Sequence, residues 1–328
     1  MLRYLGQRLV GWIVMILVAT NLTYFLASFY LDPRSNYVGR RPPVPESVVN
    51  ATLSAANIND QDPILSRWWT WVQGIVLHWD WGKSPVGESV NGQIGFRIWV
   101  SAELVLGATI LVTLIGVALG VYTAARQYSA ADRVAQGSSI VTLNIPVVVA
   151  ALAVVLIAIK INQSTGSTIF YVVGSQSLDV SGFWPTVLDR VQHLALPTIV
   201  LVITGYASTH FLQRTLLLDA LGSDFVRTAR AKGLTRQQAI RRHALRTSLI
   251  PTATSVAFSI PALFTGAVLT ESIFGWQGMG QYFTTTLRTN DINGTVAVAA
   301  FGAAMTAIGA MLADIVVVVL DPRVRLGK

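Results

Sequence analysis

Gly82-Lys83-Ser84 is the most recognisable chemical motif in this sequence, because it matches the last three positions of a phosphate-binding loop. In that loop, backbone amides and the lysine hold the phosphates of a nucleotide. The full motif also needs a glycine five positions before Gly82, where this chain has Leu77, and it needs a strand–loop–helix context that the surrounding pattern does not predict. We therefore expect no ATP site on this chain.

Three ionisable residues, Glu103, His210 and Asp314, lie in or near apolar segments. Such residues are functional candidates by default, because a charge is costly in hydrocarbon. Asp314 lies near one end of its segment, where pairing with a basic residue would explain it. His210 lies in the middle of its segment, so it could face a substrate path or make a hydrogen bond between packed helices. Both interpretations of His210 stay open.

Catalytic and metal-binding patterns are not evident elsewhere. The four histidines have no metal-ligand spacing, and the chain has no cysteine, which excludes disulfides and thiol catalysis. No acidic or nucleophilic pair accompanies a histidine in the way that an enzyme site requires. We expect no catalytic residue, no metal site and no cofactor.

The composition places this chain in a membrane. Of its 328 residues, 52% are hydrophobic and 12% are charged, and the mean hydropathy is +0.55. The apolar residues are clustered in runs of about 20 or more, the length that crosses a bilayer as a helix. The six runs are Leu9–Tyr30, Val100–Ala125, Val134–Ile159, Leu194–Leu218, Pro251–Thr270 and Thr295–Leu320. We expect an all-α integral membrane fold with six transmembrane helices, the first of them an uncleaved helix at residues 1–30.

Basic residues predict the orientation of these helices. The net charge is +8, but Lys and Arg gather in alternate short connections rather than in a nucleic-acid-binding patch. Arg3 and Arg8 precede the first run, Arg126 and Arg133 follow the second, and the connection at residues 219–250 is densely basic. By the positive-inside rule, both termini and this connection are cytoplasmic.

The polar segment 31–99 is then extracytoplasmic. It is rich in proline and contains a cluster of tryptophans, which we interpret as anchors at the level of the lipid headgroups. Residues 100–320 form the remaining five-helix core, with the cytoplasmic loop 219–250 inside it, and 321–328 form a cytoplasmic tail. Lipid is an expected partner of the basic loop, because polybasic segments beside a membrane meet anionic headgroups; nucleic acid is not.

The loop Gly222–Pro251 predicts two short helices in succession. Ser223 is a suitable N-cap for a helix that continues to Lys232, and Gly233 suits the left-handed position that ends it. Thr235 and Gln238 have the spacing of a capping box, so a second helix starts at once. We expect Pro251 to lie in the first turn of the next helix.

These residues resemble a known family. The runs RTARAKGL (Arg227–Leu234), HALR (His243–Arg246) and IP (Ile250–Pro251) are similar to the cytoplasmic "EAA" loop of ABC importer permeases. The resemblance is to the dipeptide, oligopeptide and nickel subfamily of these permeases. Within that subfamily the chain is most similar to the first permease of oligopeptide systems, and the resemblance covers nearly the whole chain. Further matches are MLRYLGQRL (Met1–Leu9), WDWGKS (Trp79–Ser84), LGVYTAARQYSAADR (Leu119–Arg133), ALP (Ala195–Pro197), ESIFGWQGMGQ (Glu271–Gln281) and LDPRVRL (Leu320–Leu326).

The resemblance implies that the first helix of the loop is a coupling helix, docked in a groove of a separate ATPase subunit. The implied docking residues are Asp224, Phe225, Val226, Arg227, Thr228, Ala229, Arg230, Ala231, Lys232, Gly233 and Leu234.

The resemblance also implies a function and partners. This chain would be a type I ABC importer permease for short peptides in a bacterial inner membrane. It would pair with a homologous second permease, cytoplasmic ATPase subunits and an extracytoplasmic substrate-binding protein. Two alternatives stay open: an ATP-independent secondary transporter or channel, and an importer of nickel or another small solute.

Two further groups of residues are candidates within the membrane. Asn144 and Pro146 suggest a kink in the third helix, which could line the translocation pathway together with His210, although proline kinks are common in membrane helices. Gly275, Trp276, Gly278 and Gly280 form a turn that could act as an extracytoplasmic gate or be a plain exposed turn.

Overall fold

The structure is a computed structural model of the whole chain. It describes the backbone of residues 2–320 and the side chains of this range apart from 2–5, 7, 260–266, 317, 318 and 320, so the predicted tail 321–328 lies outside it. Within the described range the fold is helical, and one isolated β-bridge joins Lys83 to Ser89. The chain divides into two compact units: Met1–Ala102 with Trp276–Ala307, and Glu103–Gly275 with Ile308–Lys328.

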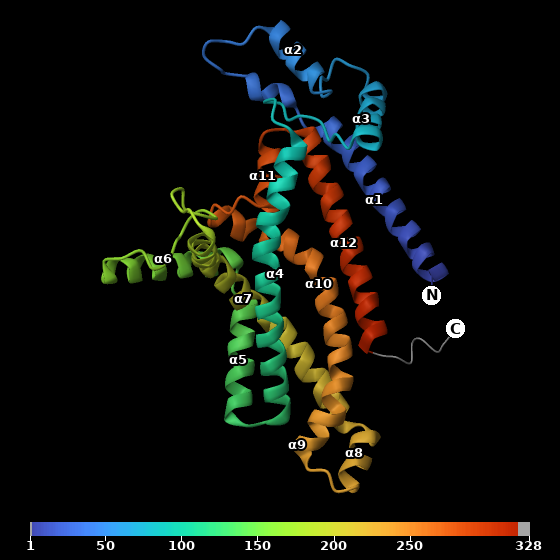
Figure 1. Cartoon of the computed structure of the whole chain (residues 1–328), viewed down its shortest axis with the longest axis vertical. Helices are drawn as coiled ribbons and strands as arrows, with labels where there is room; N and C mark the ends of the chain where they lie inside the picture. The colour runs from blue at the N-terminus through green and yellow to red at the C-terminus, as the bar shows by residue number, and fades with distance from the viewer. Residues whose placement is uncertain (1, 321–328) are drawn as a thin grey trace. The chain divides into compact units, whose positions relative to one another are not determined.

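The first unit contains α1 (Leu2–Tyr30), the 3₁₀ turn η1 (Pro33–Tyr37), α2 (Glu46–Ala55) and α3 (Ile64–His78). It also contains the start of α4 (Val90–Ala125), the short α11 (Met279–Arg288) and the first half of α12 (Ile292–Leu320). Figure 1 shows these helices along the chain. The apolar core of this first unit contains Tyr24 of α1, Leu53 of α2, Trp71 of α3 and Ile292 of α12.

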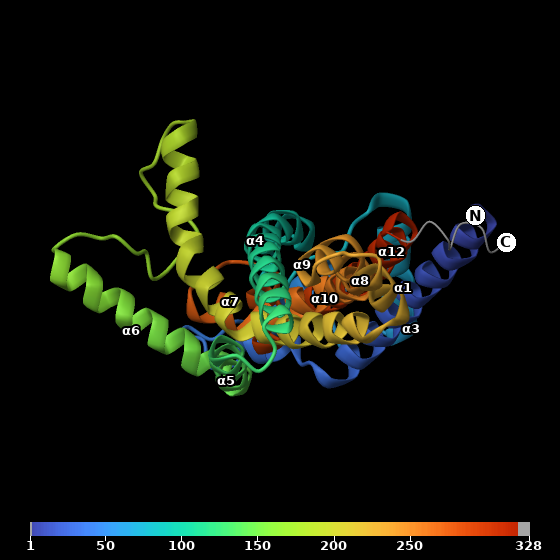
Figure 2. The ribbon, with the colours of Figure 1, turned by 90° about the horizontal axis from the view of Figure 1, so that it is seen from below.

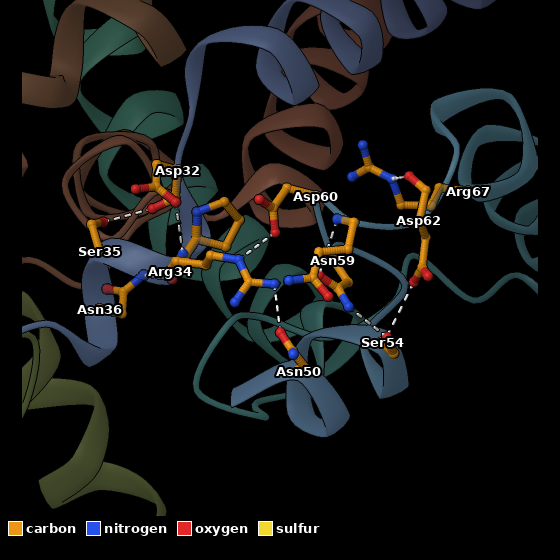
Figure 3. Close-up of polar contacts among 12 residues, drawn as sticks. Asp32, Arg34, Ser35, Asn36, Asn50, Ser54, Asn59, Asp60, Asp62 and Arg67 are labelled. Carbon is orange, nitrogen blue, oxygen red and sulfur yellow. Dashed lines mark hydrogen bonds and ion pairs between the residues drawn. The ribbon is translucent and has the colours of Figure 1, made fainter. Parts of the chain in front are cut away.

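Segment 31–99 is ordered by a polar network around Arg34, which Figure 3 shows. The guanidinium of Arg34 donates to Asn50 Oδ1 at 2.5 Å and Asn59 Oδ1 at 2.8 Å, and it also pairs with Asp60. Ser54 of α2 donates to Asp62 at 3.1 Å. These bonds hold η1 and α2 against the loop that leads to α3. Segment 31–99, for which the sequence predicted no particular fold, therefore has a defined structure.

The second unit contains most of α4, then α5 (Ala130–Asn144), α6 (Val147–Thr165), α7 (Phe183–Gly222), α8 (Asp224–Ala231) and α9 (Arg236–Ala239). A π-helical turn at Ile240–Ala244 then joins α9 to α10 (Leu245–Ile273). The long α7 is the central element, because it contacts α5, α6, α8 and α10. Figure 2 shows α6 extending away from the end of α5.

A glycine pair sets the crossing of α4 and α7. A Cβ placed on Gly116 would lie 2.6 Å from Thr209 Cβ, and one placed on Gly120 would lie 2.9 Å from the backbone oxygen of His210. The spacing is that of the GxxxG motif, which lets the backbones of two membrane helices approach closely.

Five described helices are long and apolar enough to cross a membrane, in agreement with an all-α membrane fold. These stretches are Arg8–Tyr30, Val90–Ala125, Val147–Thr165, Phe183–Gly222 and Ile292–Val316. The predicted run Pro251–Thr270 lies within the 29-residue α10, whose side chains at 260–266 are outside the description.

Several helices extend beyond the apolar runs or divide them. The second and fourth helices begin at Val90 and Phe183, before the apolar runs that start at Val100 and Leu194, because the added turns contain charged residues such as Arg97 and Asp189 that interrupt the apolar pattern. The third predicted helix is two helices. Ile145 is extended (φ −78°, ψ 121°), as the residue before a proline tends to be, and α6 starts anew after Pro146.

Candidate functional site

The basic loop 219–250 forms a compact pair of helices at the start of α10. Figure 1 shows α8 and α9 side by side there. The second predicted helix is short: α9 passes through the π turn directly into α10, so the chain from Arg236 to Ile273 is one interrupted helical rod. Pro251 consequently lies inside α10, six residues after its start, and not in its first turn as expected.

The start of α8 differs from the prediction in one detail. Ser223 occupies the N-cap position with extended backbone, but its side chain makes no cap hydrogen bond. The hydroxyl instead donates to the carbonyl oxygen of Ala220, at the end of α7. Ser223 therefore fixes the turn between α7 and α8 rather than the first amides of α8.

The end of α8 confirms the expected glycine turn. Gly233 has φ +93°, its amide donates to Arg230 O at 3.0 Å, and the Leu234 amide donates to Ala229 O at 3.3 Å. This pair of bonds is the Schellman pattern, in which a left-handed residue closes a helix. The next helix starts at once, since Thr235 and Gln238 form both bonds of the predicted capping box, at 3.3 and 3.0 Å.

One face of α8 is anchored inside the unit. Val226 and Ala229 are buried, and Val226 belongs to an apolar cluster with Leu217 of α7, Ala239 of α9 and Ile240 of the π turn. These two residues, predicted as docking residues, therefore hold the helix in place. Their burial leaves no surface for a partner.

The opposite face of α8 is free. The remaining predicted residues of the helix and its cap are exposed, with Phe225 at 46%. Leu234 is half-buried. The exposed residues are Asp224, Phe225, Arg227, Thr228, Arg230, Ala231, Lys232 and Gly233. An exposed aromatic ring and several exposed cations, on a helix fixed at both ends, form a surface suited to a protein groove.

An ion pair between a buried carboxylate and a half-buried arginine lies where α7 approaches this loop. Arg214 donates to both carboxylate oxygens of Asp132 at 3.0 Å, and Asp132 also accepts from the Tyr128 amide at 2.9 Å. Because the Arg214 guanidinium bonds it, the pKa of Asp132 is held below its usual range. Local sequence spacing does not predict this pair, because 82 positions separate the two residues.

His210 lies one turn before Arg214 and is fully buried. Its two ring nitrogens form hydrogen bonds with Thr123 of α4 at 3.1 Å and Ser139 of α5 at 2.7 Å. Gln213 extends this polar layer, donating to Ser248 of α10 at 2.9 Å and accepting from Thr252 at 2.7 Å. Of the two interpretations of His210, these contacts favour helix packing, because both nitrogens are engaged by neighbouring helices.

The other pathway candidates, Asn144 and Pro146, and the ionisable residues Glu103 and Asp314 have structural roles or partners as well. Asn144 donates to the carbonyl oxygen of Ile140 at 2.7 Å, within its own helix, and Pro146 caps α6. Glu103 pairs with Arg190 at 2.5 Å. Asp314 has a polar or electrostatic interaction within the structure.

The glycine turn at the candidate gate is not a plain exposed turn. Gly275 has φ +60°, and a Cβ there would lie 2.8 Å from Val173 Cγ1. Trp276 is 0% exposed and donates from its indole to Val100 O at 2.8 Å. Gly278 is the N-cap of α11, and Gly280 is buried in its first turn. Whether these residues gate a pathway stays a prediction.

The Gly82-Lys83-Ser84 motif forms a hairpin rather than a phosphate loop. Ser84 donates its amide to Glu88 O and accepts from the Gly87 amide, both at 2.9 Å, and Asn293 packs over Gly82. Among the described residues, no group of three or more His, Asp or Glu side chains could hold a metal ion.

Comparisons with known proteins agree on one family. The sequence model of the "Binding-protein-dependent transport system inner membrane component" family matches residues 116–326. The chain is 39% identical over 326 residues to the oligopeptide transport system permease protein OppB of Mycobacterium tuberculosis, covering 99% of each chain. It is 30% identical over 344 residues to the dipeptide transport system permease protein DppB of Escherichia coli strain K12, again covering 99% of each.

A solved structure shares the fold. Inward-facing conformations of the MetNI methionine ABC transporter include a chain that superimposes with a TM-score of 0.52, covering 70% of this chain and 97% of that one. The sequence identity is 13%, so the likeness concerns the fold alone.

Proposed function

Because this chain belongs to the binding-protein-dependent transport system inner membrane component family, we propose that it is the peptide-specific permease subunit of an ATP-driven importer. Relatives that match over nearly their whole length are named oligopeptide and dipeptide permeases, which supports short peptides as the substrate class. The same relatives argue against an ATP-independent transporter or channel.

The anchored helix α8 carries the proposal. Its buried face, with Val226 and Ala229, is packed inside the second unit, while its outer face presents Phe225, Arg227 and Arg230. A helix that is fixed at both ends and buried along one side moves as a rigid body with α7 and α10. It can therefore transmit the movement of a docked ATPase to the membrane helices.

The chemistry of ATP hydrolysis belongs to partner subunits in this proposal. ATP binding closes the ATPase pair, the docked α8 helices follow, and the permease pair changes from inward-open to outward-open. Inverting a 1:99 equilibrium to 99:1 needs ~5.5 kcal/mol of differential binding between the two states. The permease contributes half of the pathway, and a homologous permease contributes the other half.

The remaining partners follow from the orientation. With both termini and the basic loop in the cytoplasm, segment 31–99 faces outward, where an extracytoplasmic binding protein delivers the peptide. This placement corresponds to a bacterial inner membrane. The basic loop also meets the anionic headgroups of the cytoplasmic leaflet.

The test is recovery of the ATPase with the tagged permease in detergent. Charge reversal of the exposed face, Arg227→Glu with Arg230→Glu, should abolish recovery while membrane insertion is unchanged. Arg133→Glu, an exposed arginine in another cytoplasmic connection, is the matched control and should retain the ATPase. Undiminished recovery with the double variant would refute docking through α8. In vesicles, uptake of a labelled tripeptide should stop when vanadate blocks the ATPase; continued uptake would refute ATP-driven import.

A further inference from the structure

Segment 31–99 is hydrogen-bonded directly to the turn that joins α11 to α12, within the first unit. The Asn36 side chain donates to Thr289 O at 2.6 Å, and the Asn290 side chain donates to Ser35 Oγ at 2.9 Å. Figure 3 shows Ser35 and Asn36 together on η1. These bonds join η1 to residues that lie 253 and 255 positions later in the chain.

Asn293, in the first turn of α12, provides a second connection and is 1% exposed. Its side-chain amide donates to Ala56 O at 3.1 Å, at the end of α2, and to Lys83 O at 2.9 Å, in the hairpin before α4. The neighbouring Ile292 packs in the apolar core with Leu53 of α2. Both polar and apolar contacts therefore hold the start of α12 against the segment.

The candidate gate residues of the first unit lie at the opposite end of α11. This helix has 10 residues, so it is only about 15 Å long. Its start is held as well, because the Trp276 indole donates to Val100 O at 2.8 Å and the Met279 amide donates to Ser101 Oγ at 2.7 Å. A short helix that is held at both ends carries a displacement of one end to the other.

We propose that segment 31–99 is a lever for the gate: it moves as one body with α11 and the turn at 289–293. The extracytoplasmic binding protein, docked on the outer surface of the segment, then acts directly on Trp276, Gly278 and Gly280, so this proposal rests on the proposed function. The competing account is a lid that separates from α11 in each transport cycle. Separation would expose to water the apolar core that α2 shares with α12, which disfavours a lid.

The chain has no cysteine, so one introduced pair can break the connection and restore it. Ser35→Cys with Asn290→Cys removes two side-chain hydrogen bonds of Asn290, to Ser35 Oγ and from the Asp32 amide. A bis-methanethiosulfonate reagent then joins the two thiols, and a reductant releases them. Ser54→Cys with Asp62→Cys is the matched control, because these side chains are bonded at 3.1 Å within the segment alone.

Hydrogen–deuterium exchange of the solubilised complex tests the connection without transport. With free thiols at positions 35 and 290, exchange should be several-fold faster than in wild type at residues 279–294 as well as at 32–38. Crosslinking should restore protection in both stretches, because elements that form one cooperative unit open together. The control pair should leave 279–294 at wild-type rates, crosslinked or not. Exchange at 279–294 that does not respond to the thiols at 35 and 290 would overturn the proposal.

The ATPase activity of the reconstituted complex tests the lever. With free thiols at 35 and 290, stimulation by purified binding protein with bound tripeptide should fall several-fold while basal activity is unchanged, and crosslinking should restore it. A lid predicts the opposite, because crosslinking would lower stimulation further and the reductant would recover it. A wild-type complex that the binding protein does not stimulate would refute the proposed function instead, and the exchange measurement would still decide whether the segment and α11 move together.

Discussion

Arg214 of α7 donates two hydrogen bonds to Asp132 of α5, both at 3.0 Å, from Nε and Nη2 to the two carboxylate oxygens. Asp132 is buried, and its carboxylate also accepts hydrogen bonds from the Gln136 side chain and the Tyr128 amide. The pair joins the start of α5 to the part of α7 that precedes the coupling loop. In the proposed mechanism, movement of α8 would therefore reach α5 as well as α10.

Asp132→Asn tests this connection. The substitution leaves the Arg214 charge without its counter-ion, and breaking a buried pair in this way costs on the order of 3 kcal/mol. We expect a lower melting temperature of the purified complex and fewer peptides transported per ATP hydrolysed. The control is Asp219→Asn, which removes an exposed carboxylate from α7, the helix that carries Arg214. Wild-type coupling in Asp132→Asn would show that the pair does not transmit movement.

The acidity of Asp132 sets the pH range in which this pair contributes. Its pKa in the fold is below the usual value, so the pair stabilises the protein at every pH above the carboxyl range. That contribution is lost only as the pH falls below about 4. Between pH 5 and 8, the difference in melting temperature between wild type and Asp132→Asn should therefore stay constant.

The sequence predicted those features of the site that depend on neighbouring residues. The capping box at Thr235 and Gln238 and the left-handed Gly233 involve bonds between residues three to five positions apart, so local spacing was enough. The inner face of α8 was not predicted, because burial of Val226 depends on Leu217 and Ile240 in other elements. The sequence likewise left open whether His210 faces a substrate path or bonds neighbouring helices, because its partners Thr123 and Ser139 are distant in sequence.

The fold class followed from hydropathy, while the helix ends did not. Pro146 predicted a disturbance, but whether the chain kinks or breaks depends on the packing of α6 against α7, which composition does not specify. The early starts of α4 and α7 have the same origin, because the added turns contain charged residues and gain their stability from tertiary contacts.

Gly233→Ala should weaken coupling without removing any contact. A Cβ at this position would meet nothing within 4 Å, so the cost is the left-handed backbone itself, roughly 1–2 kcal/mol for a residue with a Cβ. We expect weaker ATPase recovery and slower uptake, with Gly233→Asn affected less because asparagine tolerates this conformation. Gly222→Ala is the control: that glycine ends α7 with no positive φ and equally open space. Equal effects of the two alanines would contradict this account.

Phe225→Ala and Val226→Ala should separate docking from folding. Phe225 is exposed, so its truncation should reduce ATPase recovery several-fold while the melting temperature of the isolated permease stays within a degree or two of wild type. Val226 is buried, so its truncation should lower the melting temperature, at a cost of about 1–3 kcal/mol. Size-exclusion recovery of the complex and thermal unfolding, measured on the same preparations, provide the comparison. If Val226→Ala alone lost the ATPase, the exposed face would not be the docking surface.

Gly120→Ala should disturb the crossing of α4 and α7. The added methyl group would lie 2.7 Å from Gln213 Cβ and 2.9 Å from the His210 carbonyl oxygen, so the helices must separate. Overpacking of this kind typically costs about 1–3 kcal/mol. Gly107→Ala, on the same helix but with open space around it, should have no comparable effect on the melting temperature. Equal melting temperatures for the two variants would show that the helices are not in close contact.

Asp291 gives the first unit a predictable response to pH. It precedes α12 and is buried, its carboxylate accepts from the Gly294 amide at 2.9 Å, and burial raises its pKa to about 6. Because folding favours the protonated form, the native state holds a proton that the unfolded chain releases between about pH 4 and 6. Stability should therefore fall as the pH rises through this range, by up to about 3 kcal/mol for this one group.

Asp291→Asn removes this titration while keeping an oxygen that can accept from Gly294. The variant should melt at a higher temperature than wild type above pH 6, and the difference should shrink towards zero near pH 4. Asp80→Asn is a matched control, because Asp80 accepts from the Gly82 amide at 2.9 Å in a similar turn but is exposed. A pH-independent difference between Asp291→Asn and wild type would mean that Asp291 is already ionised at pH 4. In that case a partner that stabilises the negative charge, rather than burial, would control its acidity.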